Sequence, residues 1–259
     1  MNVLSEEQIA HWKHHGWLLI DDCLSPDEVR EFPRWLEEIA NPSKQGEQRL
    51  HYYEQTSNGP VICRTERYLD DHPRLARLLT QGVLPAIASD LIGEPALLFK
   101  EKINYKHAGG AGFAPHQDAT AYRDVESPFT CLVAVDPMTR EGGCLEFGPY
   151  QHGLLPEDGD GCIDREVAAG LDWQPVEVAA GGVLFFNAFV PHRSARNDSA
   201  RARRTLYVTY NPAREGDLRV QYYERRACEI EATTDAPNAR ISNIGHFQGE
   251  PVDAKARVR

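Results

Sequence analysis

Residues 112–118 read Gly112-Phe113-Ala114-Pro115-His116-Gln117-Asp118, which places an imidazole and a carboxylate two residues apart in predicted extended backbone. Residues i and i+2 of a strand point to the same face, so His116 and Asp118 can converge on one metal ion. A third ligand is expected downstream, where a hydrophobic run beginning at Gly182 ends at His192. Two histidines and one carboxylate with open coordination positions form the ligand set of non-haem Fe(II) oxygenases.

Composition limits the classes of protein that the chain can form. Its 259 residues are 41% hydrophobic and 26% charged, which is typical of a globular domain. A net charge of −11 argues against a nucleic-acid partner, because non-specific binding needs a basic surface. Six scattered cysteines without a C-x-x-C pair indicate reduced thiols and a cytoplasmic protein. We expect no secretory signal, and no membrane partner because no apolar run approaches about 20 residues.

The first part of the chain, about residues 1–93, is predicted to be mainly helical. Ser5 and Ser25 each begin a helix, and Pro33 is expected to kink or restart the second one. The other elements expected here are strands at 17–20, 51–53 and 61–63 and helices at 73–81 and 84–92.

The second part, about residues 94–215, is predicted to be a β body followed by a weakly patterned tail, 216–259. Short strands are expected at 98–106, 130–135, 143–147, 176–178, 182–189 and 204–210. The absence of a βαβ rhythm favours a sandwich, jelly roll or barrel. We find no linker, so residues 1–259 are expected to form a single domain.

An arginine strengthens the metal-site hypothesis, because H-x-D alone is a weak signal and His116 and Asp118 can equally cap a loop and form a turn. Arg203 lies eleven residues beyond His192 on a predicted strand. If the two strands are antiparallel neighbours, both residues sit near the same end. A buried guanidinium there suits the carboxylate of a co-substrate, which it binds in a bidentate fork.

These motifs together resemble the phytanoyl-CoA dioxygenase family of Fe(II)- and 2-oxoglutarate-dependent oxygenases. The matching residues are 98–106, 112–118, 142–149 and 185–211, and the resemblance extends over about 1–215. It implies a mainly β fold with flanking helices around a double-stranded β-helix, the cupin-like jelly roll. It implies that Fe(II) is bound by His116, Asp118 and His192. It also implies that 2-oxoglutarate is bound by Arg203 and Ser194, with Asn104 and Lys102 lining its pocket.

The resemblance further implies a hydroxylase that uses O2 and decarboxylates 2-oxoglutarate to succinate and CO2. Asp118 favours hydroxylation over halogenation, because related halogenases replace this carboxylate with a small residue. Cyclisation or desaturation on the same scaffold stays open, as does a non-redox cupin-like binding protein. The chain departs from the family pattern at Tyr150-Gln151-His152, where relatives commonly have Gly-Ser-His after the Gly-Pro turn.

The substrate is expected to be a small polar or natural-product-like molecule. Some stretches are similar to those of 2-aminoethylphosphonate hydroxylases and natural-product tailoring hydroxylases. Arg64 can reach a substrate carboxylate or phosphonate, and Tyr105 and Tyr122 can line the pocket. Aromatic residues in strands more often serve packing. The sequence makes no prediction of oligomeric state.

Overall fold

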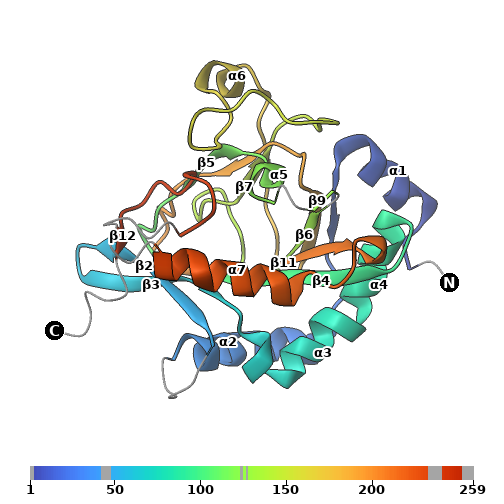
Figure 1. The fold of residues 1–259 in the computed structure, drawn as a ribbon, viewed down its shortest axis with the longest axis horizontal. Helices are drawn as coiled ribbons and strands as arrows, with labels where there is room; N and C mark the ends of the chain where they lie inside the picture. Colours follow the sequence, from blue (N-terminus) through green and yellow to red (C-terminus); the bar gives the residue numbers. More distant parts are fainter. Residues whose placement is uncertain (1–2, 42–47, 123–124, 127, 233–240, 253–259) are drawn as a thin grey trace.

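The computed structural model describes residues 3–41, 48–122, 125–126, 128–232 and 241–252. Two antiparallel sheets face each other, with helices against the outer side of the larger one (Figure 1). The larger sheet has the order β1-β9-β6-β11-β4-β3-β2-β12, and the smaller has the order β5-β10-β7-β8. This architecture confirms the predicted mainly β fold with flanking helices.

The elements have the following bounds. The strands are β1 Trp17–Ile20, β2 Leu50–Thr56, β3 Gly59–Glu66, β4 Ala96–Lys106, β5 Phe113–His116, β6 Phe129–Ala134, β7 Leu145–Phe147, β8 Gln174–Val176, β9 Val183–Asn187, β10 His192–Ser194, β11 Arg203–Pro212 and β12 Pro251–Val252. The helices are α1 Glu6–His15, α2 Pro26–Ala40, α3 Pro73–Gln81, α4 Val83–Ile92, α5 Asp118–Ala121, α6 Arg165–Ala169 and α7 Arg219–Ala232, with 3-10 turns at Leu69–Asp71 and Ala213–Glu215.

The helices at the start of the chain begin where the sequence predicts. Ser5 and Ser25 each form a capping box, in which the serine side chain accepts from a backbone N–H and the third helical residue bonds back. Pro33 lies inside α2, which continues to Ala40 as one helix, so the helix does not restart there. A proline removes only one backbone donor, and the buried face around Phe32 and Leu36 holds the helix together.

The two faces of the larger sheet have opposite chemistry. The outer face packs side chains such as Ile103, Leu206 and Phe185 against α1 to α4, and α2 and α3 lie below the sheet in Figure 1. The inner face carries polar side chains, which on β4 are Lys100, Lys102, Asn104 and Lys106 and on β11 are Arg203, Thr205, Tyr207 and Thr209. Because side chains alternate along a strand, β4 and β11 supply both the core and a polar interior.

The tail that the sequence left uninterpreted is packed into this body. Tyr222 and Tyr223 of α7 form a buried cluster with Phe99 and Tyr122. The Tyr223 hydroxyl donates to the Glu101 carbonyl at 3.0 Å and accepts from the Glu101 N–H at 3.2 Å. Figure 1 shows α7 running along β4 and β11. The segment 241–252 then lies against β5 and ends as β12 beside β2.

One stretch, Pro73–Ile92, is long and apolar enough to cross a membrane by length and composition alone. The sequence expectation of no apolar run near that length overlooked it. Here it forms α3 and α4, separated at Gly82. Residues such as Leu79, Leu84 and Ile87 lie in the hydrophobic core between the larger sheet and the helices, called here the helix-facing core.

Replacing Tyr223 by alanine tests whether α7 belongs to the folded core. We expect Tyr223→Ala to lower the free energy of unfolding by about 3–5 kcal/mol, because it empties a buried aromatic site. The matched control is Val220→Ala on the same helix, whose side chain is 61% exposed and whose loss changes stability by about 0.5 kcal/mol or less. Denaturant titration measures both, and equal effects would contradict this packing.

Candidate active site

Three predicted ligands converge between the two sheets. His116 ends β5, His192 begins β10, and the two residues are direct partners in the antiparallel pair. Asp118 carboxylate Oδ1 lies 3.8 Å from Nε2 of each histidine. One candidate ligand atom from each of the three residues lies within 4.8 Å of the others, and all three residues are buried.

The strand predicted through Asp118 ends earlier, because Asp118 is the first residue of α5. Gln117 keeps extended dihedral angles, φ −118° and ψ 130°, so the two-residue spacing still turns His116 and Asp118 to the same side. The Gln117 amide donates to the carbonyls of Gly153 and Phe189. The backbone between the two candidate ligands is therefore fixed by loops from elsewhere in the chain.

Hydrogen bonds orient each candidate ligand for a cation. Nδ1 of His116 donates to the Ala114 carbonyl at 2.7 Å, and Nδ1 of His192 donates to Val190 at 3.0 Å. Each neutral ring therefore keeps its Nε2 lone pair for a metal. The Thr130 hydroxyl donates to Asp118 Oδ2 at 3.0 Å, which leaves Oδ1 facing the histidines.

The electrostatics favour the ligand protonation states. Burial, together with His192, lowers the pKa of His116 to about 3, which keeps its imidazole neutral. Burial alone would raise the pKa of Asp118, but His192, Lys102 and His116 hold it at about 2. A deprotonated carboxylate beside two neutral imidazoles fits Fe(II), whose binding requires these forms.

A cationic corner lies beside the triad. It contains Arg203 of β11 and Lys106 of β4, which are directly opposite each other in the antiparallel strand register. Nη1 of Arg203 donates to the Gly143 carbonyl at 2.9 Å, and its buried Nε has no hydrogen-bond partner. Nζ of Lys106 donates to the Ser194 hydroxyl at 2.9 Å and to the Ala195 carbonyl at 2.5 Å. Sequence reasoning missed Lys106, although the alternation from Lys102 and Asn104 along β4 places it on the same face.

A second cationic group contains Arg64 and Lys102, which line the same cavity as the triad. Nε of Arg64 donates to the Asn104 side-chain oxygen at 3.1 Å, and Nη1 donates to the Ile241 carbonyl at 2.5 Å. Its Nη2 is buried without a partner. Burial and the charge of Arg64 lower the pKa of Lys102 to about 7. Together these side chains leave donors available to an anion.

The structure does not bring the two predicted tyrosines to this cavity. Tyr105 belongs to the helix-facing core, because it alternates with Asn104 on β4. Tyr122 lies in the cluster with Phe99 and Tyr222, where the Lys100 ammonium sits 5.4 Å from its ring centre. The cavity instead includes His246, from the tail, whose ring centre lies 4.1 Å from that of His116. No motif marked this histidine in the sequence.

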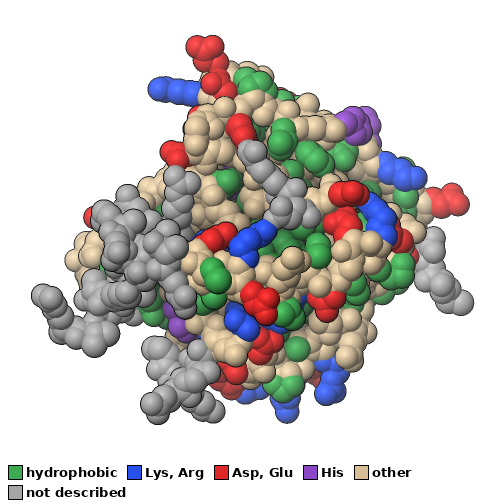
Figure 2. Space-filling model, viewed as in Figure 1, with side chains coloured by type: hydrophobic (Ala, Val, Ile, Leu, Met, Phe, Trp, Pro, Cys, Tyr) green, Lys and Arg blue, Asp and Glu red, His purple; other side chains and the backbone are tan. Residues whose placement is uncertain are grey.

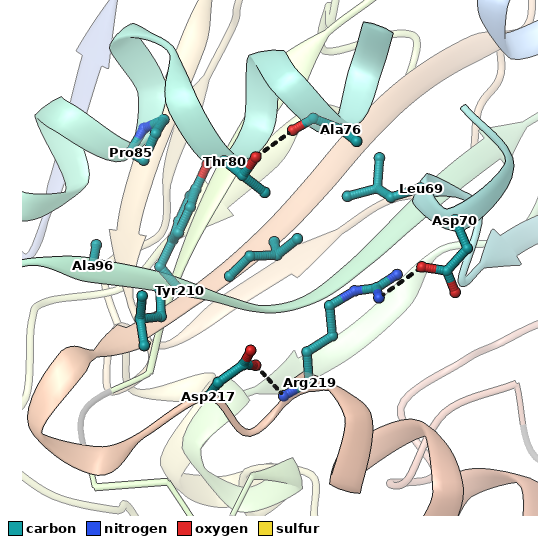
Figure 3. A pocket seen from close by; sticks show the side chains of 11 residues that line it. Leu69, Asp70, Ala76, Thr80, Pro85, Ala96, Tyr210, Asp217 and Arg219 are labelled. Atoms are coloured by element: carbon teal, nitrogen blue, oxygen red, sulfur yellow. Dashed lines mark hydrogen bonds and ion pairs between the residues drawn. The ribbon is translucent and has the colours of Figure 1, made fainter. Parts of the chain in front are cut away.

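A separate and roomier pocket lies between α3, α4 and the outer ends of β4 and β11 (Figure 3). Its principal polar side chains already have partners. Arg219 pairs with Asp70 at 3.0 Å, the Thr80 hydroxyl donates to the Ala76 carbonyl, and the Tyr210 hydroxyl donates to the Leu79 carbonyl. These groups are already engaged with other parts of the protein, so the triad cavity is the better candidate active site.

Comparison with known proteins agrees with this geometry. The sequence profile of the family described as phytanoyl-CoA dioxygenase matches residues 12–205. The chain belongs to this family. It is 46% identical to methylphosphonate hydroxylase of Gimesia maris, covering 96% of this chain and 97% of that protein. It is 35% identical to 2-aminoethylphosphonate dioxygenase of the uncultured bacterium HF130_AEPn_1, covering 86% and 88% respectively.

The solved structures that resemble it share the fold at low identity. The crystal structure of EctD from S. alaskensis with 2-oxoglutarate and 5-hydroxyectoine has a TM-score of 0.70, at 20% identity, and covers 83% of this chain and 78% of that one. The family and its hydroxylase relatives confirm the predicted enzyme class: a non-haem iron dioxygenase that uses 2-oxoglutarate and O2. They disfavour the alternative of a non-redox cupin-like binding protein.

Gly143 connects the cationic corner to a strained turn. Its φ is +66°, and a Cβ there would lie 2.3 Å from the Ala195 carbonyl oxygen. We expect Gly143→Ala to displace the carbonyl that Arg203 uses and to weaken 2-oxoglutarate binding about tenfold, or about 1.4 kcal/mol. Gly159→Ala is the control, because a Cβ at Gly159 meets open space. Anaerobic binding titrations compare the two, and unchanged affinity in Gly143→Ala would refute this dependence.

Proposed function

We propose that this enzyme hydroxylates a small phosphonate, and that methylphosphonate is converted to hydroxymethylphosphonate with succinate and CO2 as co-products. The observation that carries the proposal is the buried guanidinium of Arg64. Arg64 lines the triad cavity together with Lys102, and its buried Nη2 has no hydrogen-bond partner. The 46% identity to a methylphosphonate hydroxylase over nearly its whole length supports the same substrate class.

His116, Asp118 and His192 are the proposed ligands of Fe(II). When bound there with 2-oxoglutarate and O2, the iron supplies the oxidation of a substrate C–H bond. The chain itself fixes the two imidazole rings through backbone carbonyls and holds the carboxylate through Thr130. With Asp118 present as the third ligand, the arrangement favours hydroxylation over halogenation.

Arg203 and Ser194 are the proposed partners of the distal carboxylate of 2-oxoglutarate. The unpartnered Nε of Arg203 and the Ser194 hydroxyl both lie in the buried corner that Lys106 completes. Burial and the nearby Arg203 charge lower the pKa of Lys106 well below its usual value. A carboxylate would offset the desolvation of both cations, because a buried charge is costly until it is paired.

Arg64, Asn104 and Lys102 are proposed to hold the phosphonate. Sequence resemblance assigned Asn104 and Lys102 to the co-substrate, but Asn104 accepts from Arg64, which favours the substrate side. Lys102 lies between the Arg64 side of the cavity and the β11 side that carries Arg203, since its ammonium is 4.9 Å from the ring centre of Tyr207 on β11. Phosphonate oxygens accept charge-assisted hydrogen bonds from guanidinium and ammonium groups.

The charge and size of the cavity suit a small anion. Glu66 is already paired with Lys100 at 3.4 Å and Arg64 at 3.7 Å. Among the described residues that line the cavity, Asp118 supplies the carboxylate, and we assign it to the metal. The cavity has a volume of only about 20 Å³, well below the roughly 300–1,000 Å³ of typical small-molecule sites. These features favour a compact anion over a bulky thioester.

We also propose a cytoplasmic protein without nucleic-acid or membrane partners. All six cysteines are free and widely spaced. The net charge is −11, and acidic and basic side chains are interspersed over the face that carries α7 (Figure 2). This charge pattern does not favour a polyanionic partner.

Anaerobic addition of Fe(II) and 2-oxoglutarate tests the metal and co-substrate assignments. We expect a metal-to-ligand charge-transfer band in the parent protein. Arg203→Ala should weaken 2-oxoglutarate binding about 30-fold or more, because removing a buried charge partner costs about 2 kcal/mol or more. His116→Ala and Asp118→Ala should lose iron. Unchanged iron binding in either ligand variant would show that the assignment is wrong.

Steady-state kinetics with methylphosphonate test the substrate assignment. We expect Arg64→Ala to raise the KM for methylphosphonate about 10- to 100-fold, because a hydrogen bond to a charged group is worth about 1.5–3 kcal/mol. Its affinity for 2-oxoglutarate should change little. Arg196→Ala serves as the control, because Arg196 is exposed and pairs with Asp198. Equal KM values for Arg64→Ala and the parent would argue against the phosphonate contact.

A further inference from the structure

The C-terminal segment 241–252 contributes His246 to the lining of the triad cavity, although the family profile ends at residue 205. The Ala114 N–H of β5 donates to the His246 carbonyl at 2.7 Å, and the Gln248 N–H donates to Gly112 at 3.1 Å. Further along, Pro251 pairs with Glu54 of β2. The segment is therefore hydrogen-bonded to both sheets, one through β5 and the other through β2.

Close backbone approaches fit this segment to the body. A Cβ on Gly112 would lie 2.7 Å from the Gln248 side-chain oxygen, and one on Gly161 would lie 2.8 Å from Ile244. A Cβ on Gly245 would meet Asp160 at 2.8 Å. Since glycines occupy the contact on both partners, the segment packs more closely than side chains would permit.

His246 is the polar side chain that this segment brings to the cavity. The residue is 4% exposed, and its ring lies between those of Phe113, at 5.1 Å, and His116, at 4.1 Å. Its Nδ1 lies 3.2 Å from the Ile244 carbonyl, so Nδ1 carries the proton and donates. Nε2 of the neutral ring is then an acceptor. His246 is not one of the three described residues whose candidate ligand atoms converge, which are His116, Asp118 and His192.

The cations of the proposed phosphonate site are the charged neighbours of this ring. Arg64 and Lys102 both line the cavity with His246. Arg64 is also held by the same segment, through its bond to the Ile241 carbonyl at 2.5 Å. The segment thus positions one phosphonate donor and adds a second polar group of a different kind.

We propose that His246 binds the phosphonate directly, through a hydrogen bond between its Nε2 and a phosphonate oxygen. This inference rests on the proposed function and deepens it. The proton in that bond comes with the substrate. A phosphonate monoanion carries one P–OH proton, and phosphate-type groups lose it only around neutral pH, with a second pKa of about 6 for phosphate esters. Whichever atom holds the proton, one donor and one acceptor face each other.

The contact gives the site a means of discrimination that the cations lack. Arg64 and Lys102 attract any compact anion, including a sulfonate. Methanesulfonate has the shape of methylphosphonate but no proton to share with Nε2. Its oxygen would then face an unshared lone pair, which is repulsive in a buried site.

Two amide variants separate substrate binding from structural support. The side-chain nitrogen of asparagine lies near the Nδ1 position and can keep the bond to Ile244, whereas the amide of glutamine reaches the Nε2 position. We expect His246→Asn to raise the KM for methylphosphonate about 10- to 100-fold with unchanged 2-oxoglutarate affinity. His246→Gln should stay within about threefold of the parent. The charge-transfer band and thermal unfolding check that both variants are intact.

Each possible result either supports or overturns the proposed contact between His246 and the phosphonate. A parent-like KM in His246→Asn, or equal losses in both variants, would overturn it, because the role would then be absent or purely structural. Methanesulfonate, titrated into the anaerobic iron and 2-oxoglutarate complex, should bind at least about tenfold more weakly than methylphosphonate. Equal affinity would overturn the shared proton. If the parent itself does not hydroxylate methylphosphonate, the proposed function fails, and this contact fails with it.

Discussion

The pairing of His116 with His192 across β5 and β10 is the contact on which the candidate active site depends. It joins two residues 76 positions apart, as the difference between their numbers shows, and it faces both Nε2 atoms toward Asp118. A slip of one residue in this register would turn His192 to the other side of the smaller sheet. The strand β7 pairs with the other edge of β10, where Phe147 lies opposite His192, and this second pairing fixes the register.

The burial of charged side chains is the second constraint. It follows from the His116–His192 pairing, which places the triad between the two sheets. With the triad enclosed between two sheets, β4 and β11 face it with Lys102, Lys106 and Arg203. Buried cations are costly unless they have partners, and several of these retain unpaired atoms or lowered pKa values. An anionic co-substrate and an anionic substrate would meet that requirement. The electrostatics of the fold and the proposed chemistry therefore point to the same ligands.

The sequence predicted much of the fold, and the His116 and Asp118 part of the candidate metal site, because these rest on short-range patterns. Capping boxes, alternating strands and the H-x-D spacing are local, and each limits backbone direction over a few residues. Prediction was weaker where contacts are distant. Tyr105 and Asn104 are neighbours in the chain, yet they lie on opposite faces of β4, and alternation does not say which face borders the cavity.

The sequence by itself determined the kinds of ligand, the class of fold and the family, since these depend on residue identity and spacing. The tertiary structure decided which distant groups meet around that ligand set. It brought Lys106 to Ser194, turned Arg64 toward the cavity and carried His246 from the tail to the ring of His116. The physical reason is that these contacts depend on strand order and on close packing, and neither is encoded in a local pattern of residues.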